Sequence, residues 1–296
     1  MKPTIELLIT DLDNTLYDWF DFWYHSFTAM LDQIAAISGI PREQLEPEIK
    51  KVYEKHGTSE YSFLIEELDP LLRMYSSQEI REMYEPAIRA YREARSEHLR
   101  LYPNVLETLK QIKSQGSKII AYTESLEFYS TYRIKKLDLD GILDIVYFPR
   151  DHDLPEGMTT EQVRHYSSEH YRLQHTQTRH TEKGESKPNP ELLTHIIQSV
   201  GGTRQLTAYV GDKLPKDVKM AQDAGVIDIY AKYGDTVQDA RYELLRRVTH
   251  WKAASVESEK TMTVADVSPR YTLLHSFQEL LDIFVFRPFV APQAAG

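Results

Sequence analysis

The sequence has no cysteine, and this absence excludes several kinds of protein at once. Disulfide-stapled scaffolds, cysteine-ligated zinc sites, iron–sulfur clusters and thiol nucleophiles all require a residue that the chain does not contain. Any catalysis must therefore use oxygen or nitrogen groups.

Long apolar runs are also absent. A helix that spans a membrane needs about 18 or more consecutive apolar residues, and no segment of the chain comes near that length. The amino-terminal segment MKPTIELLITDLD carries one short apolar run that ends at Asp11, which is too brief for a signal peptide. We therefore expect a soluble, cytoplasmic protein without a membrane partner.

Positive charge is scarce relative to negative charge. The chain has 35 lysine and arginine residues against 45 acidic residues, and its net charge is −10. This charge would repel a phosphate backbone, so we do not expect a nucleic acid polymer as a partner. The remaining composition, 41% hydrophobic and 27% charged over 296 residues, is typical of a folded chain with one large domain or two moderate ones.

Short β-prone runs alternate with helical patterns through much of the chain. The runs are TIELLIT, KIIAYT, DIVYF, LTAYV and VIDIYA, and helical patterns separate the last four. This alternation predicts an α/β fold with a doubly wound parallel sheet that helices cover on both faces. Ligands of such sheets bind at the carboxyl ends of the strands.

The stretch from 17 to 102 differs because it is helical throughout. Aromatic and aliphatic residues recur at intervals of three and four after Trp19, which is typical of a helix with a wide apolar face. We therefore predict an all-helical subdomain at 17–102, inserted into an α/β core that consists of residues 1–16 and 103–296.

Two polar segments fit the alternation less well. Residues 149–186 form an insertion with histidines at intervals of five, and residues 253–269 are predicted to be loop. Five-residue steps rotate by about 140° on a helix and do not stack ligands on one face. We therefore favour a solvated helix or loop over a zinc site in the insertion. The histidines concerned are His165, His170, His175 and His180.

The strongest local signal directly follows the first predicted strand. In DLDNTLYD, the residues Asp11, Asp13 and Thr15 form the pattern D-x-D-x-T. In an extended segment the two aspartates point to the same side. Taken alone, the pattern is also typical of an Asx-rich turn that caps a helix.

Three further polar segments lie at or beside predicted strand ends. GDKLPKD contains Asp212 and Asp217, KIIAYTES contains Thr123 and Glu124, and SKPNPELL contains Lys187. Each segment has an ordinary structural interpretation by itself, since acidic residues favour helix starts and lysines are commonly solvated surface charges.

Together, the four segments resemble the motifs of the haloacid dehalogenase-like hydrolase superfamily in their order and spacing. The match covers residues 1–16 and 103 to about 235. The helical stretch between the first two motifs is similar to the helical cap of that family. The resemblance implies a Rossmannoid core and a hydrolase of the phosphatase branch.

The resemblance also implies a role for each motif residue. Asp11 would be the nucleophile and Asp13 the acid/base, with Thr123 and Lys187 as further catalytic residues. The implied Mg²⁺ ligands are Asp11, Asp13 through its main-chain carbonyl, Asp212 and Asp217, the last through water or by orienting Lys187. The implied substrate-binding residues are Thr15, Thr123, Glu124, Lys187, Tyr17 and Trp19.

The chemistry of these residue types agrees with the implied roles. Carboxylates that meet at strand ends repel one another unless a cation is present, and oxygen-rich ligation without cysteine suits Mg²⁺. One carboxylate can attack phosphorus to give an aspartyl-phosphate, while a second protonates the leaving oxygen and later deprotonates water. We therefore predict a Mg²⁺-dependent phosphomonoester hydrolase that acts on a small phosphorylated metabolite.

Other functions remain open at this point. A phosphomutase would use the same intermediate, and Tyr17, Trp19 and Trp23 suggest a 5′-nucleotidase, although an aromatic stripe at helical spacing is more often core. A dehalogenase is disfavoured because Asp13 supplies a general acid. The inserted helical stretch at 17–102 and the presence of Asp13 disfavour a signalling receiver module. A non-catalytic phospho-binding module is disfavoured because every matched catalytic position is filled. The sequence leaves the particular substrate and the oligomeric state open.

Overall fold

The computed structural model describes residues 2–290, apart from residues 153, 155–158, 160–163, 165, 183 and 262–263. The chain divides into two compact units. The α/β unit consists of Met1–Asp18, Arg100–Asp235 and Met262–Gly296, and the helical unit consists of Trp19–Leu99 and Thr236–Thr261.

The α/β unit is built on a seven-stranded sheet with the order β5-β4-β3-β2-β6-β7-β8. Every neighbouring pair is parallel, which confirms the predicted doubly wound α/β class. The strands are β2 (Leu7–Thr10), β3 (Lys118–Tyr122), β4 (Ile145–Phe148), β5 (Gln177–His180), β6 (Thr207–Gly211), β7 (Ile227–Ala231) and β8 (Tyr271–Leu273). A separate parallel pair joins β1 (Thr4–Ile5) to β9 (Val285–Phe286).

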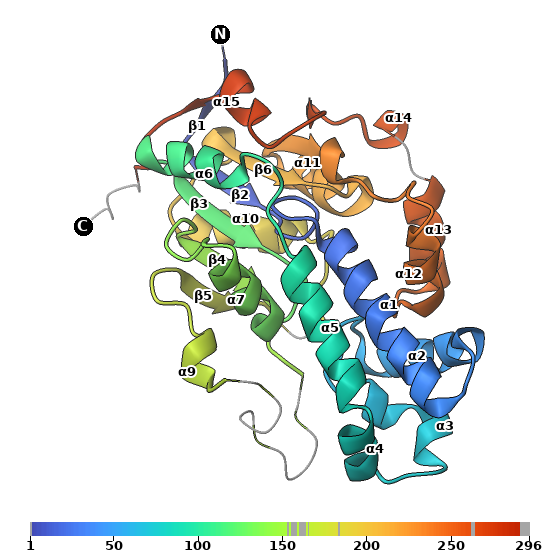
Figure 1. The fold of residues 1–296 in the computed structure, drawn as a ribbon. Coiled ribbons are helices and arrows are strands. Elements are labelled where there is room, and N and C mark those ends of the chain that lie inside the picture. The colour runs from blue at the N-terminus through green and yellow to red at the C-terminus, as the bar shows by residue number, and fades with distance from the viewer. Residues whose placement is uncertain are drawn as a thin grey trace. The chain divides into compact units, whose positions relative to one another are not determined.

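The central strands are apolar because both faces of the sheet are buried. On one face, Leu7 and Ile9 of β2 pack with Leu193, Ile197 and Met220 of the neighbouring helices. These helices are α10 (Pro190–Ser199) and α11 (Lys219–Ala224). On the near side of the sheet in Figure 1 lie α6 (Val105–Ser114) and α7 (Glu127–Lys136). Shorter elements of the unit are α9 (Ser168–Tyr171), η2 (Arg204–Leu206), η3 (Leu214–Val218), η4 (Lys232–Gly234), α14 (Val264–Val267) and α15 (Glu279–Ile283).

The helical unit contains no strand among the residues that the structure describes. Its elements are α1 (Trp19–Ser38), α2 (Arg42–His56), η1 (Ile65–Glu67), α3 (Asp69–Leu72), α4 (Ser77–Met83), α5 (Glu85–His98), α12 (Tyr242–Val248) and α13 (Ala253–Thr261). The aromatic stripe of α1 forms core, because Phe20, Trp23 and Phe27 are fully buried and their rings stack in sequence. None of the described helices combines the length and the hydropathy that a bilayer span requires.

The helical unit differs from its predicted extent of 17–102 because it also takes in residues 236–261, which the prediction placed in the α/β core. Arg247 pairs with Glu46 at 2.6 Å, and the Ser59 hydroxyl lies 2.9 Å from Nδ1 of His250. Most of the predicted 253–269 loop is helical, in α13 and α14. The sequence of α13 is mostly polar and carries no apolar stripe, so hydrophobic periodicity could not reveal this helix.

The polar insertion at 149–186 contributes a strand to the sheet, which corrects the expectation of only a solvated helix or loop. Within it, β5 pairs in parallel with β4 at the sheet edge, and its side chains are half-buried or exposed. An edge strand of this kind needs no apolar run. Nε2 of His180 lies 2.9 Å from Glu127, while His165 lies outside the described residues. The other three, His170, His175 and His180, join no metal-type cluster in the described part of the chain.

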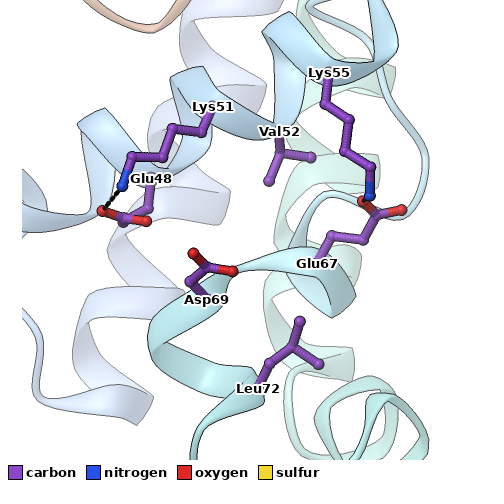
Figure 2. Close-up of a pocket in the computed structure, with 7 residues that line it drawn as sticks. All are labelled: Glu48, Lys51, Val52, Lys55, Glu67, Asp69 and Leu72. Atoms are coloured by element: carbon purple, nitrogen blue, oxygen red, sulfur yellow. Dashed lines mark hydrogen bonds and ion pairs between the residues drawn. The ribbon is translucent and has the colours of Figure 1, made fainter.

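A pocket of about 290 Å³ opens on the helical unit (Figure 2). Two ion pairs lie in its walls, since Glu48 pairs with Lys51 at 2.7 Å and Glu67 with Lys55 at 2.7 Å. Burial opposes ionisation of Glu67, but hydrogen bonds from His56 and Lys55 lower its pKa to about 2. The lining residues are Glu48, Lys51, Val52, Lys55, Glu67, Asp69 and Leu72, and no predicted site residue is among them.

Candidate active site

The four predicted motifs meet at the carboxyl edge of the sheet. Asp11 follows β2, Thr123 follows β3 and Asp212 follows β6, and these three strands are neighbours in the sheet order. Because the strands are parallel, their carboxyl ends lie at the same edge. Lys187 approaches from the segment before α10.

Lys187 is the buried cation of this site. Its Nζ donates to Oδ1 of Asp11 at 2.5 Å and to Oδ1 of Asp217 at 2.9 Å. It also lies over the rings of Tyr122 and Tyr209, at 5.0 and 5.5 Å from their centroids. Burial alone would lower the pKa of Lys187, but Asp11 and Asp217 raise it well above its usual value. The amine therefore stays charged at neutral pH.

Asp217 orients Lys187 and is itself held from two further sides. The hydroxyl of Tyr209 donates to its Oδ1 at 2.9 Å, and the backbone N–H of Lys213 donates to its Oδ2 at 3.1 Å. Gly211 allows this approach, because a Cβ there would lie 2.4 Å from Cγ of Asp217. With both oxygens engaged, Asp217 is fixed as the partner of the lysine.

Three carboxylates form a buried acidic cluster: Asp11, Asp212 and Asp217. One oxygen of each lies within 4.8 Å of the others. Burial raises the pKa of Asp11 to about 8, with added effects from Asp217 and Asp13 and opposition from Lys187. Burial likewise raises the pKa of Asp212 well above its usual value. Two neighbouring buried acids whose pKa values are both raised are typical of a site that binds a cation.

Mg²⁺ fits the donor set of the acidic cluster. Oδ2 of Asp212 is buried and accepts no hydrogen bond from the described residues, and Nζ of Lys213 lies 3.7 Å away. A buried carboxylate oxygen without a donor carries a desolvation penalty that a hard cation would remove. The donors are all oxygens, as Mg²⁺ prefers.

The Asp13 side chain lies outside the acidic cluster. Its Oδ2 accepts from Ser125 Oγ at 2.6 Å and from Thr123 Oγ1 at 3.3 Å, and its Oδ1 accepts from Nη1 of Arg133 at 3.1 Å. The side chain of Asp13 is 20% exposed, whereas that of Arg133 is 1% exposed. The two aspartates of the first motif thus have different surroundings, and each has its own buried cation.

Glu124 ties the second, third and fourth motifs together. Its Oε1 accepts from the backbone N–H of Lys187 at 3.0 Å, and its Oε2 accepts from Nζ of Lys216 at 2.6 Å. Burial opposes ionisation of Glu124, but Lys216 and Lys187 lower its pKa below the usual value. Because both oxygens are engaged, Glu124 fixes the position of the segment that carries Lys187.

The remaining predicted residues are not members of the acidic cluster. Thr15 is fully buried, and its carbonyl accepts from the hydroxyl of Tyr233 at 2.5 Å. Tyr17 is also fully buried, and burial together with the charge of Asp13 raises its pKa well above the usual value. Of the aromatic residues considered for base stacking, Trp19 is half-buried, whereas Tyr17 and Trp23 have almost no exposed surface.

Four residues of the site went unnoticed in the sequence: Ser125, Arg133, Tyr209 and Lys216. Ser125 offered a weak signal, because it stands two residues after Thr123 beyond the same strand. Tyr209 looks like an ordinary strand residue. The arginine and the second lysine sit on helical elements, where charged residues are common, so only the folded chain reveals their partners.

Gly234 packs closely against the backbone of the first motif. A Cβ at this position would lie 1.6 Å from the carbonyl oxygen of Asn14, whose φ is 57°. Gly234→Ala should therefore displace the Asp11–Asn14 loop, lowering both Tm and catalytic rate, the latter by about tenfold or more. Thermal unfolding and steady-state assays check this.

A control separates crowding at Gly234 from the general effect of replacing a glycine with alanine. Gly39 has a φ of 72° and nothing within 4 Å of an added Cβ, so Gly39→Ala should cost only about 1 kcal/mol. Equal losses of Tm and rate in the two variants would contradict the packing role of Gly234.

Comparison with known proteins agrees with the fold. A family model described as haloacid dehalogenase-like hydrolase matches residues 5–225 of the chain. A glyceraldehyde 3-phosphate phosphatase of Methanopyrus kandleri is 23% identical over 234 residues, covering 78% of this chain and 85% of the relative. Another protein of that name, from Methanocaldococcus jannaschii, is 24% identical over 239 residues, covering 79% and 90%.

Solved structures share the fold at low sequence identity. A 2-haloacid dehalogenase from Pseudomonas syringae pv. Tomato DC3000 has a TM-score of 0.55 at 17% identity, covering 95% of this chain and 98% of that one. A HAD phosphatase from Thermococcus onnurineus has a TM-score of 0.54 at 16% identity, covering 97% and 100%.

The parallel sheet and the acidic cluster at its strand ends place the chain among the doubly wound α/β enzymes. Within that class, the chain belongs to the haloacid dehalogenase-like hydrolase family, since the family model matches most of its length. The predicted family resemblance is thereby confirmed.

Proposed function

We propose that the chain is a Mg²⁺-dependent phosphomonoester hydrolase that acts on a small phosphorylated metabolite through an aspartyl-phosphate. The observation that carries the proposal is the buried contact of Lys187 with Asp11 and Asp217. Beside it lies a buried carboxylate oxygen of Asp212 that accepts no hydrogen bond from the described residues. This arrangement combines a carboxylate nucleophile, a fixed cation and a set of metal ligands.

The proposed reaction has two displacements at phosphorus. An Asp11 oxygen bonds to phosphorus as the ester P–O bond breaks, and the leaving oxygen takes a proton from Asp13. A water molecule then attacks phosphorus and gives a proton to Asp13, while the P–O bond to Asp11 breaks and phosphate is released. Lys187 and Thr123 would bind the phosphoryl oxygens on which negative charge accumulates.

Mg²⁺ bound to Asp11, Asp212 and the carbonyl of Asp13 would neutralise phosphoryl charge and orient the phosphoryl group. Asp217 would act through the lysine, because Lys187, Tyr209 and the Lys213 amide engage its oxygens. This assignment separates the predicted set of four metal residues into direct ligands and one positioning residue.

The names of the two relatives suggest a first substrate. Both are glyceraldehyde 3-phosphate phosphatases, and each aligns with more than three quarters of this chain. We therefore place glyceraldehyde 3-phosphate at the head of a panel of sugar phosphates, nucleoside monophosphates and p-nitrophenyl phosphate.

The test is phosphate release from this panel in the presence of Mg²⁺, with product identification. We expect free phosphate and the dephosphorylated alcohol, and no isomerised phosphate ester. An isomer would indicate a phosphomutase, and halide release from a 2-haloacid without phosphatase activity would indicate a dehalogenase. No turnover of any phosphate ester by folded, Mg²⁺-loaded protein would overturn the proposal.

A further inference from the structure

A buried guanidinium faces the carboxylate that the proposed mechanism uses as its acid/base. Nη1 of Arg133 lies 3.1 Å from Oδ1 of Asp13 and 3.0 Å from Oγ of Ser125, and the same hydroxyl lies 2.6 Å from Oδ2 of Asp13. The three side chains therefore close a ring of hydrogen bonds. We call these residues the Asp13 clamp.

The Asp13 clamp is separate from the lysine that serves the nucleophile. Lys187 bonds to Asp11 and Asp217, and Arg133 bonds to Asp13 and Ser125. Each carboxylate of the first motif is thus oriented by a different buried cation. A guanidinium fits this task because Nη1 carries two N–H groups, so one nitrogen donates both to Asp13 and to Ser125 and fixes the direction of the contact as well as its charge.

Burial of the Arg133 side chain is energetically unfavourable by itself. The side chain is 1% exposed, and removing a guanidinium from water is destabilising unless its partners are well placed. Ser125 and Thr123 already give the Asp13 carboxylate two hydroxyl donors. The Asp13 carboxylate therefore has hydrogen-bond donors even without the arginine. The added contact with Arg133 constrains the direction of the carboxylate.

We infer that Arg133 is the positioning residue of the acid/base, holding the partly exposed Asp13 carboxylate where it can exchange a proton with the leaving oxygen. The inference rests on the proposed function. Its consequence depends on the leaving group, because an alkoxide needs the proton of Asp13 to depart, whereas p-nitrophenolate departs without it. A merely structural arginine would affect both esters alike.

The experiment compares Arg133→Met with wild type on glyceraldehyde 3-phosphate and p-nitrophenyl phosphate. For the alkyl ester, kcat/KM should fall by about 10²-fold, the lower end of the general-acid contribution. For the aryl ester, kcat/KM should fall by less than about threefold, since this ratio reports only the steps up to departure of the leaving group.

The second displacement gives an independent signal. Water attack still needs Asp13 as a base, so Arg133→Met should release p-nitrophenolate in a burst of about one equivalent per enzyme, followed by a slower steady state. Arg133→Lys, which keeps a cation, should recover part of the activity toward the alkyl ester. Lys136→Met, an exposed change on the same helix, should behave as wild type.

Folding is checked by circular dichroism and Tm. If Arg133→Met does not fold, Ser125→Ala carries the test, because it removes the hydroxyl shared by Asp13 and Arg133 and should lower kcat/KM for the alkyl ester selectively. Equal losses with both esters, or no loss with either, would overturn the inference alone. Wild-type protein that hydrolyses neither ester would overturn the proposed function, and the inference with it.

Discussion

Replacing Asp11 with asparagine should abolish hydrolysis while the protein stays folded. An amide cannot form the acyl-phosphate bond, and loss of a covalent nucleophile costs about four orders of magnitude or more in kcat. The side chain keeps nearly its size, and Lys187, which contacts both Asp11 and Asp217, retains Asp217 as a charged partner. Phosphate release under saturating Mg²⁺ measures the effect.

Asp138→Asn is the matched control for this substitution. Asp138 is exposed and has a φ of 57°, a conformation that asparagine adopts readily, so the variant should keep full activity. Mass spectrometry of acid-quenched wild type should find the phosphoryl group on the peptide that contains Asp11. Substantial turnover by Asp11→Asn, or a phosphoryl group elsewhere, would contradict the proposed nucleophile.

The same substitution should raise Tm in metal-free buffer. The pKa of Asp11 is about 8 in the folded chain against 3.8 as the reference value, so its charged form is disfavoured by folding. The stability that the protonated acid gives is fully present below about pH 4 and is lost as pH rises through about 8. The Tm advantage of Asp11→Asn should therefore grow between pH 4 and pH 8, and a constant difference would count against the repulsion argument.

The sequence predicted the part of the fold in which burial dictates residue type. β2, β3, β6 and β7 are buried along almost their whole length, so their apolar runs are visible without a structure. β5 escaped prediction because an edge strand with exposed side chains needs no apolar run. Residues 236–261 escaped for another reason, since their partners lie far back in the chain, on α2.

The candidate site divides in the same way. Asp11, Asp212 and Thr123 could be placed together because parallel strands deliver their carboxyl ends to one edge. Arg133 could not be placed, because its contact with Asp13 depends on how α7 packs against the sheet and on which of its turns faces inward. Motif spacing therefore predicts the site residues that the parallel strands bring together. It does not predict side chains that reach the site through the packing of a helix.

Removing divalent metal should abolish activity, and Mg²⁺ should restore it. Asp11 and Asp212 are buried close together with raised pKa values, so the folded site lacks a positive charge that Lys187 alone does not supply. EDTA treatment followed by titration with MgCl₂ measures the requirement. Zn²⁺ should substitute poorly, because it prefers nitrogen and sulfur ligands in tetrahedral sites.

Asp212→Asn should raise the Mg²⁺ concentration for half-maximal activity by about 10- to 100-fold or more, since even loss of a residue that only supports a metal ligand has an effect of this size. Asp235→Asn is the control, because Asp235 adds to the negative field at Asp212 but lies outside the acidic cluster and bonds to the hydroxyl of Tyr230 at 2.6 Å. Its requirement for Mg²⁺ should change little.

Thermal unfolding gives a readout that does not depend on turnover. A ligand that binds only the folded state stabilises it by RT ln(1 + [L]/Kd), so Mg²⁺ should raise the Tm of wild type and of Asp235→Asn and have little effect on Asp212→Asn. Full activity after EDTA treatment, or an equal Tm rise in all three proteins, would show that Asp212 does not hold the metal. The buried Asp212 oxygen would then need another cationic partner, and Lys213, whose Nζ lies 3.7 Å away, could supply it.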